Sequence, residues 1–414
     1  MHSRRNLALF FVSTTTSTFS LDSRVKALAS NISTCASFIS RAKLVLRHPL
    51  LTFIFKFIVT IPFTGRRRIM VMSLSKAVTV IRNSLAFNRP QHVQWFLTRR
   101  CNYRCRGCNI WQEQDSRELS TEEVKIGLDI LRKMGVVDVV FSGGNPLLRD
   151  DIEEILRYAS SHFIVTVYDN GSLAAEKVDA LRYADFVAIS IDSLDPKKND
   201  YLKGVDGAWH RAMEAIKRLR EVGINVCVSP TISQHNLYEL LDLTRYFAEH
   251  ENPVWYCLYS YDSPENIEEA FSIGKMRDDY TITDREGMVK LCRGLMELQK
   301  RYGYILITNE ILSAIMNLYS TGMRTWKCKA LQNFFVINHL GQVSGCHLHK
   351  PIASIFELPK AWNSRKFNML RKTYSECTRC TYLCYIFYSL HGSPAGSLQI
   401  ARQHWKNAKL FLKK

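Results

Sequence analysis

Cys101-Asn102-Tyr103-Arg104-Cys105-Arg106-Gly107-Cys108 is the stretch that decides the fold. Its three cysteines have the spacing C-x3-C-x2-C and directly follow an apolar run that contains Trp95, Phe96 and Leu97. Three thiolates this close in sequence can hold three corners of a cubic 4Fe–4S cluster and leave the fourth iron without a protein ligand. An open coordination position is typical of a catalytic metal site rather than a structural one.

A zinc site and a set of unrelated buried thiols are the alternatives for this group. Structural zinc sites use four ligands, usually in C-x2-C pairs, so the three-residue gap between Cys101 and Cys105 disfavours zinc. We therefore expect Cys101, Cys105 and Cys108 to hold an iron–sulfur cluster. Cysteines grouped at short spacings indicate metal binding in a reducing compartment rather than a disulfide framework, which predicts a cytoplasmic location.

Around this stretch, short apolar runs alternate with helical patterns. Strands are expected at 92–98, 136–141, 163–168, 186–191, 224–232 and 254–259. Helices are expected between them at 121–134, 151–160, 175–182, 209–221 and 237–250, and after them at 284–302 and 310–319. Connections long enough for a crossover helix predict a parallel α/β sheet, most simply a partial (β/α)6 TIM-like barrel. In such barrels the chemistry lies at the carboxyl ends of the strands, where the three cysteines also fall.

Glycine and polar residues follow two further strands. The second strand leads into Ser142-Gly143-Gly144-Asn145-Pro146, where two glycines permit close backbone approach to a ligand. Ser190 and Asp192 follow the fourth strand, and a carboxylate can accept hydrogen bonds from two neighbouring hydroxyl groups of a ligand. Local capping of the turn before Pro196 is the alternative for Asp192.

A second cysteine group lies downstream, at Cys328, Cys346, Cys377, Cys380 and Cys384. Four of these five thiols are enough for an auxiliary cluster or for a structural zinc ion. His347 and His349 beside Cys346 keep the zinc alternative open.

Together these motifs resemble the radical S-adenosylmethionine (SAM) superfamily with a SPASM or twitch-like auxiliary cluster domain. The resemblance covers about 92–390. It implies that SAM binds the open iron of the first cluster, is reductively cleaved there and yields a 5′-deoxyadenosyl radical that abstracts hydrogen from a substrate. An external one-electron donor of the ferredoxin or flavodoxin type is also implied.

The resemblance assigns roles residue by residue. Gly143, Gly144 and Asn145 position the methionine end of SAM, with Asn145 in place of the family's Glu. Ser190 and Asp192 contact its ribose. Gly107 stands where the family usually has an aromatic residue, and Tyr103 or Trp111 could supply a ring instead. No residue that handles protons is identified.

The downstream group implies one auxiliary 4Fe–4S cluster. The full SPASM pattern has seven cysteines for two clusters, whereas five are present here. Cys328, Cys346, Cys377 and Cys380 make a complete set, and Cys384 either replaces one of them or lies beside it.

Charge and composition suggest five segments along the 414 residues. Residues 1–72 hold eleven Lys and Arg against one acid, Asp22, and form a basic leader with an apolar, interfacial-helix pattern at 48–63. The barrel is expected at 90–275, a helical linker at 276–325, the auxiliary cluster domain at 326–390 and a basic helical tail at 391–414. More than half of the net charge of +18 lies in the leader, so the charge of the remaining chain is only weak support for nucleic-acid binding.

These features predict a radical SAM enzyme that abstracts hydrogen from a peptide or small metabolite. A lipid or isoprenoid substrate at the membrane surface is an alternative, suggested by the leader, and would make the protein peripheral to a membrane. RNA modification is suggested only by charge. A non-enzymatic zinc-binding protein is the remaining alternative, suggested by the departures at Asn145 and Gly107.

Overall fold

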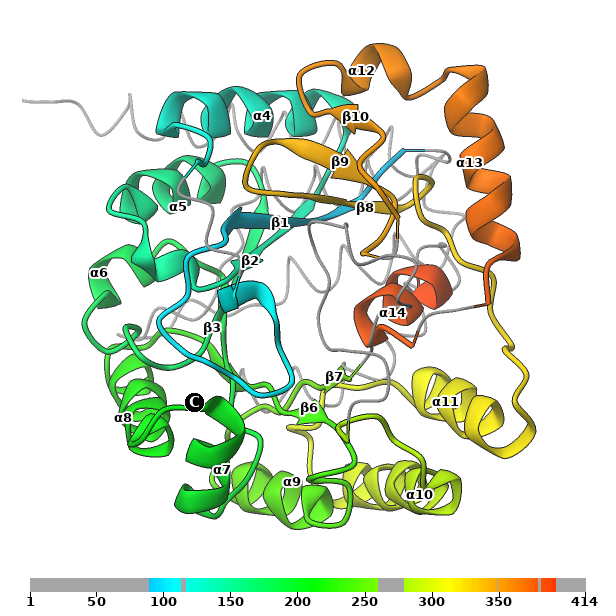
Figure 1. The fold of residues 1–414 in the computed structure, drawn as a ribbon. Helices are drawn as coiled ribbons and strands as arrows, with labels where there is room; N and C mark the ends of the chain where they lie inside the picture. Colours follow the sequence, from blue (N-terminus) through cyan, green and yellow to red (C-terminus); the bar gives the residue numbers. More distant parts are fainter. Residues whose placement is uncertain (1–88, 113–116, 260–278, 348, 379–380, 392–414) are drawn as a thin grey trace, which may run out of the picture. The chain divides into compact units, whose positions relative to one another are not determined.

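The parallel sheet begins with the strand that carries the cysteine stretch at its end. A computed structural model describes residues 89–112, 117–259, 279–347, 349–378 and 381–391. Within them β1 (His92–Thr98), β2 (Asp138–Gly143), β3 (Ile164–Asp169), β4 (Phe186–Ile189) and β5 (Val226–Val228) pair in parallel and in chain order. The sheet lies among surrounding helices (Figure 1).

The barrel continues past β5 through irregular pairing. Val254 bridges in parallel to both Val228 and Ile305, and β6 (Thr231–Ile232) pairs in parallel with β7 (Cys257–Leu258). Strand structure therefore falls in all six expected strand regions. The predicted α/β fold with an open, partial barrel is confirmed.

The helices that cover the sheet agree closely with the apolar periodicity. They are α4 (Thr121–Met134), α5 (Ile152–Ser160), α6 (Val178–Leu181), α8 (Ala208–Glu221), α9 (Leu240–Glu249), α10 (Arg285–Arg301) and α11 (Asn309–Thr321). Helix α4 begins at a capping box, in which Ser120 and Glu123 satisfy each other's backbone N–H groups. It packs so closely on β1 that a Cβ at Gly127 would lie 2.5 Å from the Trp95 ring. Two 3-10 turns, η1 (Ile110–Gln112) and η2 (Pro146–Leu148), and helix α7 (Pro196–Lys203) were not expected from the sequence.

The C-terminal region contributes strands to the same sheet. Its elements are β8 (Phe334–Ile337), β9 (Gln342–Ser344), β10 (Ala353–Ser354), α12 (Leu358–Ala361), α13 (Arg365–Glu376) and α14 (Leu383–His391). Strand β8 pairs in parallel with β1, with His92 opposite Phe334 and Trp95 opposite Ile337. The strand order is thus β10-β9-β8-β1-β2-β3-β4-β5, and β1 is an interior strand.

Helix α14 packs on the face of β1 and β8 that lies opposite Trp95. Tyr388 stacks on His92 with ring centroids 4.4 Å apart, and Tyr385 stacks on Phe334 at 4.8 Å. The side chains of His92 and Trp95 point to opposite faces because they are three positions apart on one strand. Helix α14 is therefore part of the core rather than of a detached tail.

Several expectations fall on parts of the chain that the structure does not describe. The basic leader and its apolar segment at 48–63 lie outside the described residues, as does the helix expected in the tail at 391–414 beyond His391. Among the described helices, none combines the length and apolar character needed to cross a membrane. The lipid alternative stays a prediction.

Candidate active site

Three thiols of the first cysteine group lie together at the carboxyl end of β1. Burial raises the pKa of Cys105 to about 12 and that of Cys108 to about 11, and it also raises the pKa of Cys101. Cys101 and Cys108 both act electrostatically on Cys105, and Cys101 also acts on Cys108, which indicates that the three thiols lie close together. Thiols held this way stay protonated unless a metal takes the proton's place, which is the behaviour expected of cluster ligands.

The described residues contain no group of three or more His, Cys, Asp or Glu side chains arranged around a single metal ion. In a 4Fe–4S cluster each thiolate binds a different iron, so its protein ligands do not converge on one point.

Helix α7 holds the cysteine loop in place through backbone contacts. Arg106 N donates to Leu202 O at 3.0 Å. Gly204 ends the helix with φ +66°, and a Cβ there would lie 2.1 Å from Arg104 O. The last turn of α7 therefore touches the loop between Cys101 and Cys108.

This contact brings a buried cation to the thiols. Lys203, the last residue of α7, is 4% exposed and donates to Ser190 Oγ at 2.6 Å and to Asp192 Oδ2 at 2.7 Å. Its charge lowers the pKa of Cys105 and Cys108. The sequence identified Ser190 and Asp192 but missed Lys203, whose only local signal was its place before Gly204.

Asp192 also ties the ends of neighbouring strands together. Its Oδ1 accepts from Thr231 N at 2.8 Å, and its backbone N–H donates to Asn199 Oδ1 at 3.0 Å. The cap of α7 is a different residue, Asp195, which accepts from Lys197 N at 2.9 Å. The structure thus places Ser190 and Asp192 beside the thiols through Lys203.

The glycines after β2 form a tight cradle against the start of the cysteine loop. Gly143 has φ +138°, and a Cβ on it would lie 2.3 Å from Thr98 O. A Cβ on Gly144 would lie 2.2 Å from Arg100 O. Any side chain at either position would push the strand end away from the loop, so the two glycines set their close approach.

Asn145 is completely buried, and its side chain is fully engaged. Its Oδ1 accepts from Leu147 N at 2.9 Å. A backbone N–H can only donate, so the amide nitrogen must face the other way. There Nδ2 lies near three acceptors: Asn102 Oδ1 at 3.3 Å, Asn170 Oδ1 at 3.2 Å and Ser172 Oγ at 3.1 Å.

A buried carboxylate lies next to this amide, at the end of β3. Asp169 is 4% exposed, and its Oδ2 accepts from Gly171 N at 2.6 Å. Its Oδ1 has no hydrogen-bond partner among the described residues. Burial raises the pKa of this carboxyl to about 7, against smaller lowering effects of Gly171 and Asn145. Asp-Asn-Gly after a strand is ordinary turn chemistry, so the sequence alone assigned Asp169 no role.

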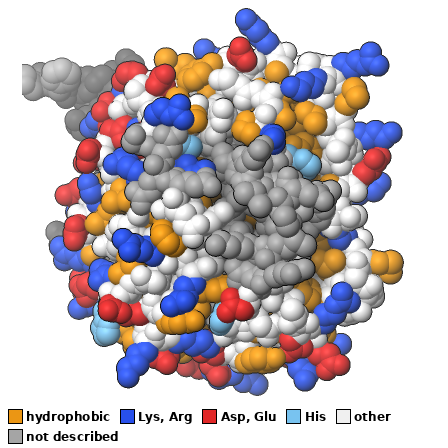
Figure 2. Space-filling model, in the orientation of Figure 1, with side chains coloured by type: hydrophobic (Ala, Val, Ile, Leu, Met, Phe, Trp, Pro, Cys, Tyr) orange, Lys and Arg blue, Asp and Glu red, His pale blue; other side chains and the backbone are white. Residues whose placement is uncertain are grey.

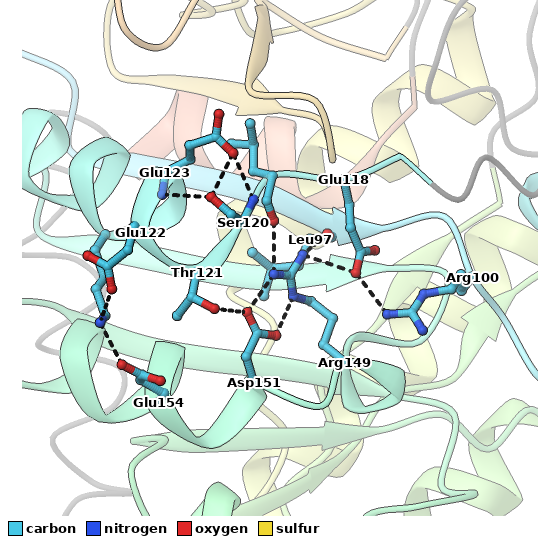
Figure 3. Close-up of polar contacts among 12 residues, drawn as sticks. Leu97, Arg100, Glu118, Ser120, Thr121, Glu122, Glu123, Arg149, Asp151 and Glu154 are labelled. Atoms are coloured by element: carbon cyan, nitrogen blue, oxygen red, sulfur yellow. Dashed lines mark hydrogen bonds and ion pairs between the residues drawn. The ribbon is translucent and has the colours of Figure 1, made fainter.

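Behind the cysteine loop, a buried arginine joins three loops (Figure 3). Arg149 donates to Leu97 O at 3.2 Å, to Leu119 O at 2.9 Å and in a bidentate pair to Asp151 at 2.8 and 2.7 Å. Glu118 accepts from Arg100 at 2.8 Å and lies 3.4 Å from Arg149. Arg149 thus fixes the end of β1 immediately before Cys101.

The ring that the sequence lacks at position 107 is supplied from another part of the chain. A Cβ on Gly107 would lie 2.7 Å from the Tyr280 ring and 3.1 Å from the Tyr259 ring. The Trp111 indole instead donates to Cys105 O at 3.1 Å, and the Tyr103 hydroxyl accepts from Arg211 at 3.2 Å. The aromatic surface beside Gly107 is therefore built by two tyrosines that local spacing could not identify.

The second cysteine group gathers around α13. Cys328 and Cys346 are buried, and both act electrostatically on Tyr374 of that helix, while Cys377 is its C-cap. Cys384, at the start of α14, acts instead on Tyr168 in β3. The structure thus places three of the thiols near the end of α13 and directs Cys384 toward the barrel.

Two family models match the chain. The model of the radical SAM superfamily matches residues 95–244, and that of the SPASM iron–sulfur cluster-binding domain matches residues 328–381. The first match contains Cys101, Cys105 and Cys108. The second ends three residues before Cys384.

Two curated relatives each match less than half of this chain. An AdoMet-dependent heme synthase of Nitratidesulfovibrio vulgaris is 32% identical over 157 residues, which is 36% of this chain and 43% of the relative. The antilisterial bacteriocin subtilosin biosynthesis protein AlbA of Bacillus subtilis is 29% identical over 165 residues, 38% of this chain and 37% of the relative. The matches thus span less than half the length of these two relatives.

Among solved structures, SuiB of Streptococcus suis bound to S-adenosylmethionine has a TM-score of 0.57 and 16% identity, and covers 72% of this chain and 71% of its own. A likeness at this identity concerns the fold. SuiB has also been solved with its precursor peptide SuiA.

Proposed function

This chain is a radical SAM superfamily protein with a C-terminal iron–sulfur cluster-binding domain, and we propose that it is an enzyme that cleaves SAM reductively at Cys101, Cys105 and Cys108. The observation that carries the proposal is that three half-buried thiols and the Gly143–Gly144 cradle lie side by side at the carboxyl edge of the sheet. When bound, the cluster and SAM supply a 5′-deoxyadenosyl radical that abstracts hydrogen from a substrate.

The protein's own residues prepare this site. Lys203 favours the thiolate form of Cys105 and Cys108, which is the form that binds iron. Gly143 and Gly144 leave room for the methionine end of SAM beside the cysteine loop, and Ser190 and Asp192 face its ribose. Helix α7 and Arg149 hold the loop from two sides, so the thiols keep their spacing.

For the substrate we propose a peptide or a small metabolite. The support is an auxiliary cluster domain and the character of the similar proteins, which include a bacteriocin biosynthesis protein, a heme synthase and an enzyme solved with a precursor peptide. An auxiliary cluster suits substrate oxidation, because it offers an outlet for electrons. The one-electron donor is external, of the ferredoxin or flavodoxin class. On the face shown in Figure 2, Lys and Arg lie among Asp and Glu rather than in one basic stripe, so that face adds no support for RNA.

The test is formation of 5′-deoxyadenosine from SAM by the anaerobically purified full chain with a chemical reductant. We expect Cys105→Ala to abolish product. Cys292→Ala is the matched control, because Cys292 is buried in α10 and burial is the sole influence on its pKa among the described groups. Equal product from wild type and Cys105→Ala would refute the proposal. Iron and sulfide counts of about four per cluster separate the enzyme from the zinc-binding alternative.

A further inference from the structure

Asp169 is a buried carboxylate whose environment lacks a second donor. Its Oδ2 is satisfied by Gly171 N, whereas Oδ1 has no hydrogen-bond partner within the described part of the chain. An unsatisfied buried acceptor destabilises the folded state, and it does so more strongly when it carries a charge. A carboxylate held in such a place is therefore a site for a ligand group that can donate.

The polar neighbours of Asp169 already donate hydrogen bonds to other acceptors. A hydrogen bond from the Asn145 side chain helps to lower the pKa of Asp169, but Nδ2 also donates to Asn102, Asn170 and Ser172, and Asp169 Oδ1 is left without a partner among the described residues. The cation Lys203 donates to Ser190 and Asp192. Neither group offers Asp169 Oδ1 a hydrogen bond in this arrangement.

The position of Asp169 relates it to the first cysteine group. Its charge acts on Cys101 and on Tyr103, both in the cysteine loop. Its own turn is joined to that loop, because Asn170 Nδ2 donates to Asn102 Oδ1 at 3.0 Å and Asn102 donates to Ser172 Oγ at 2.8 Å. A ligand bound at the open iron would therefore lie within reach of the end of β3.

The methionine end of SAM carries an amino group, which donates hydrogen bonds whether or not it is protonated. Asn145 offers this group no carboxylate: its Oδ1 already accepts from Leu147 N as the cap of η2, its Nδ2 is a donor, and the side chain is completely buried. We propose that Asp169 Oδ1 accepts a hydrogen bond from the amino group of SAM and so performs the recognition that position 145 does not. This inference rests on the proposed function and adds a residue to its cofactor site.

The test compares two ligands on two proteins by equilibrium dialysis under anaerobic conditions. The ligands are SAM and its analogue without the amino group, and the proteins are the iron-loaded full chain and its Asp169→Asn variant. Asparagine keeps the acceptor for Gly171 N and the shape of the turn but removes the charge. We expect Asp169→Asn to weaken SAM binding by about 10- to 100-fold, the range of a charge-assisted hydrogen bond, and to weaken binding of the analogue much less.

Asp179→Asn is the matched control, because the Asp179 side chain is 84% exposed on α6 and distant in sequence from the thiols. It should bind both ligands as wild type does. A second readout is the electron paramagnetic resonance spectrum of the reduced cluster, which SAM should perturb in Asp169→Asn only at raised concentration. Asp169→Asn combined with Asn145→Glu returns a carboxylate to the same group of residues and should recover part of the lost affinity.

Equal SAM affinity of wild type and Asp169→Asn overturns the inference, and so does an equal loss for SAM and its analogue, since a structural role would weaken both alike. If the Asp169→Asn variant fails to retain iron, the Asp169→Glu variant is measured instead. Glutamate keeps the negative charge but moves it by one methylene group. The inference then requires the ratio of SAM affinity to analogue affinity to be smaller in Asp169→Glu than in wild type. Failure of wild type to bind SAM at all would instead refute the proposed function.

Discussion

Arg149 shows how much of the site depends on a single side chain. It is 3% exposed, and it joins Leu97 O, Leu119 O and Asp151 (Figure 3). Burial by itself raises the pKa of the Asp151 carboxyl, but hydrogen bonds from Arg149 and Thr121 outweigh burial and hold the pKa below its ordinary value. A carboxyl with a lowered pKa stabilises the fold above its unfolded pKa of about 3.9, and this contribution is lost as the pH falls below it.

We expect Arg149→Met to lower the free energy of unfolding by about 3 kcal/mol at neutral pH, because it leaves Asp151 and Glu118 without their buried partner. The loss should shrink as the pH falls through the lowered pKa of Asp151, because below it the carboxyl is protonated in both proteins. Urea denaturation of the iron-free chain across this pH range measures both effects. Arg132→Met is the control, since its pair with Asp129 is exposed and should contribute less than about 1 kcal/mol. A pH-independent loss would contradict the role assigned to Asp151.

At the residue scale, the sequence predicted the cysteine and glycine motifs but not the charged groups around them. Cysteine spacing is a local property, so Cys101, Cys105 and Cys108 could be recognised without a structure. Lys203 and Asp169 become distinctive only through burial beside residues that are distant in sequence. An aspartate in a turn and a lysine at a helix end are both ordinary surface patterns.

Helix α7 is the element that fixes the cysteine loop, and its end at Gly204 makes this testable. We expect Gly204→Ala to lower bound iron from about eight to about four atoms per chain, because the new Cβ would collide with Arg104 O and displace the first cysteine group. Iron and sulfide analysis after anaerobic reconstitution gives the measurement.

Gly322→Ala is a close control for this substitution. Gly322 also ends a helix with positive φ, at +76°, but a Cβ there would meet no atom within 4 Å. It should cost about 1 kcal/mol of backbone strain and leave the iron count unchanged. Equal iron in the two variants would mean that α7 does not position the loop.

A turn before Pro196 was expected from the sequence, but the helix that follows it, α7, was not. The signals for a helix were present, with Asp195 as N-cap, Pro196 at the first position and Gly204 beyond the end. Its buried residues, however, are Asn199, Leu202 and Lys203, so the apolar periodicity that identified α4 and α8 is missing. Apolar periodicity therefore does not identify a helix whose buried face carries polar side chains, as the buried face of α7 does.

On the scale of the whole molecule, the two cluster regions share one sheet through β1 and β8. Phe335 in β8 is fully buried and packs on Trp362 with ring centroids 5.6 Å apart. We expect Phe335→Ala to lower the free energy of unfolding by about 3–5 kcal/mol and to speed amide hydrogen exchange in β1 as well as in β8. Hydrogen–deuterium exchange with mass spectrometry reports the two strands separately.

Met369→Ala serves as the control for this prediction, because Met369 is 63% exposed on α13 and should change stability by less than about 0.5 kcal/mol. Faster exchange confined to β8 would show that the two regions unfold independently. The chain would then behave as two independently unfolding domains that are joined through the β1–β8 strand pair.

The pairing of β8 with β1 could not be predicted from local patterns. The six strands of the barrel alternate with helices, and this alternation itself implies parallel order. Phe334-Phe335-Val336-Ile337 lies between Cys328 and Gly341, in a region whose cysteines indicated loops. Its partner strand is more than two hundred residues away in sequence, and only the folded sheet identifies it.

The position of β1 between β2 and β8 also bears on how the protein is made. A ribosome releases the chain from its N-terminus, and early segments can fold as they emerge. The strand that presents Cys101 gains its second neighbour only when Phe334–Ile337 has been synthesised, more than two hundred residues later. The sheet around the first three cysteines is therefore complete only after β8 has left the ribosome.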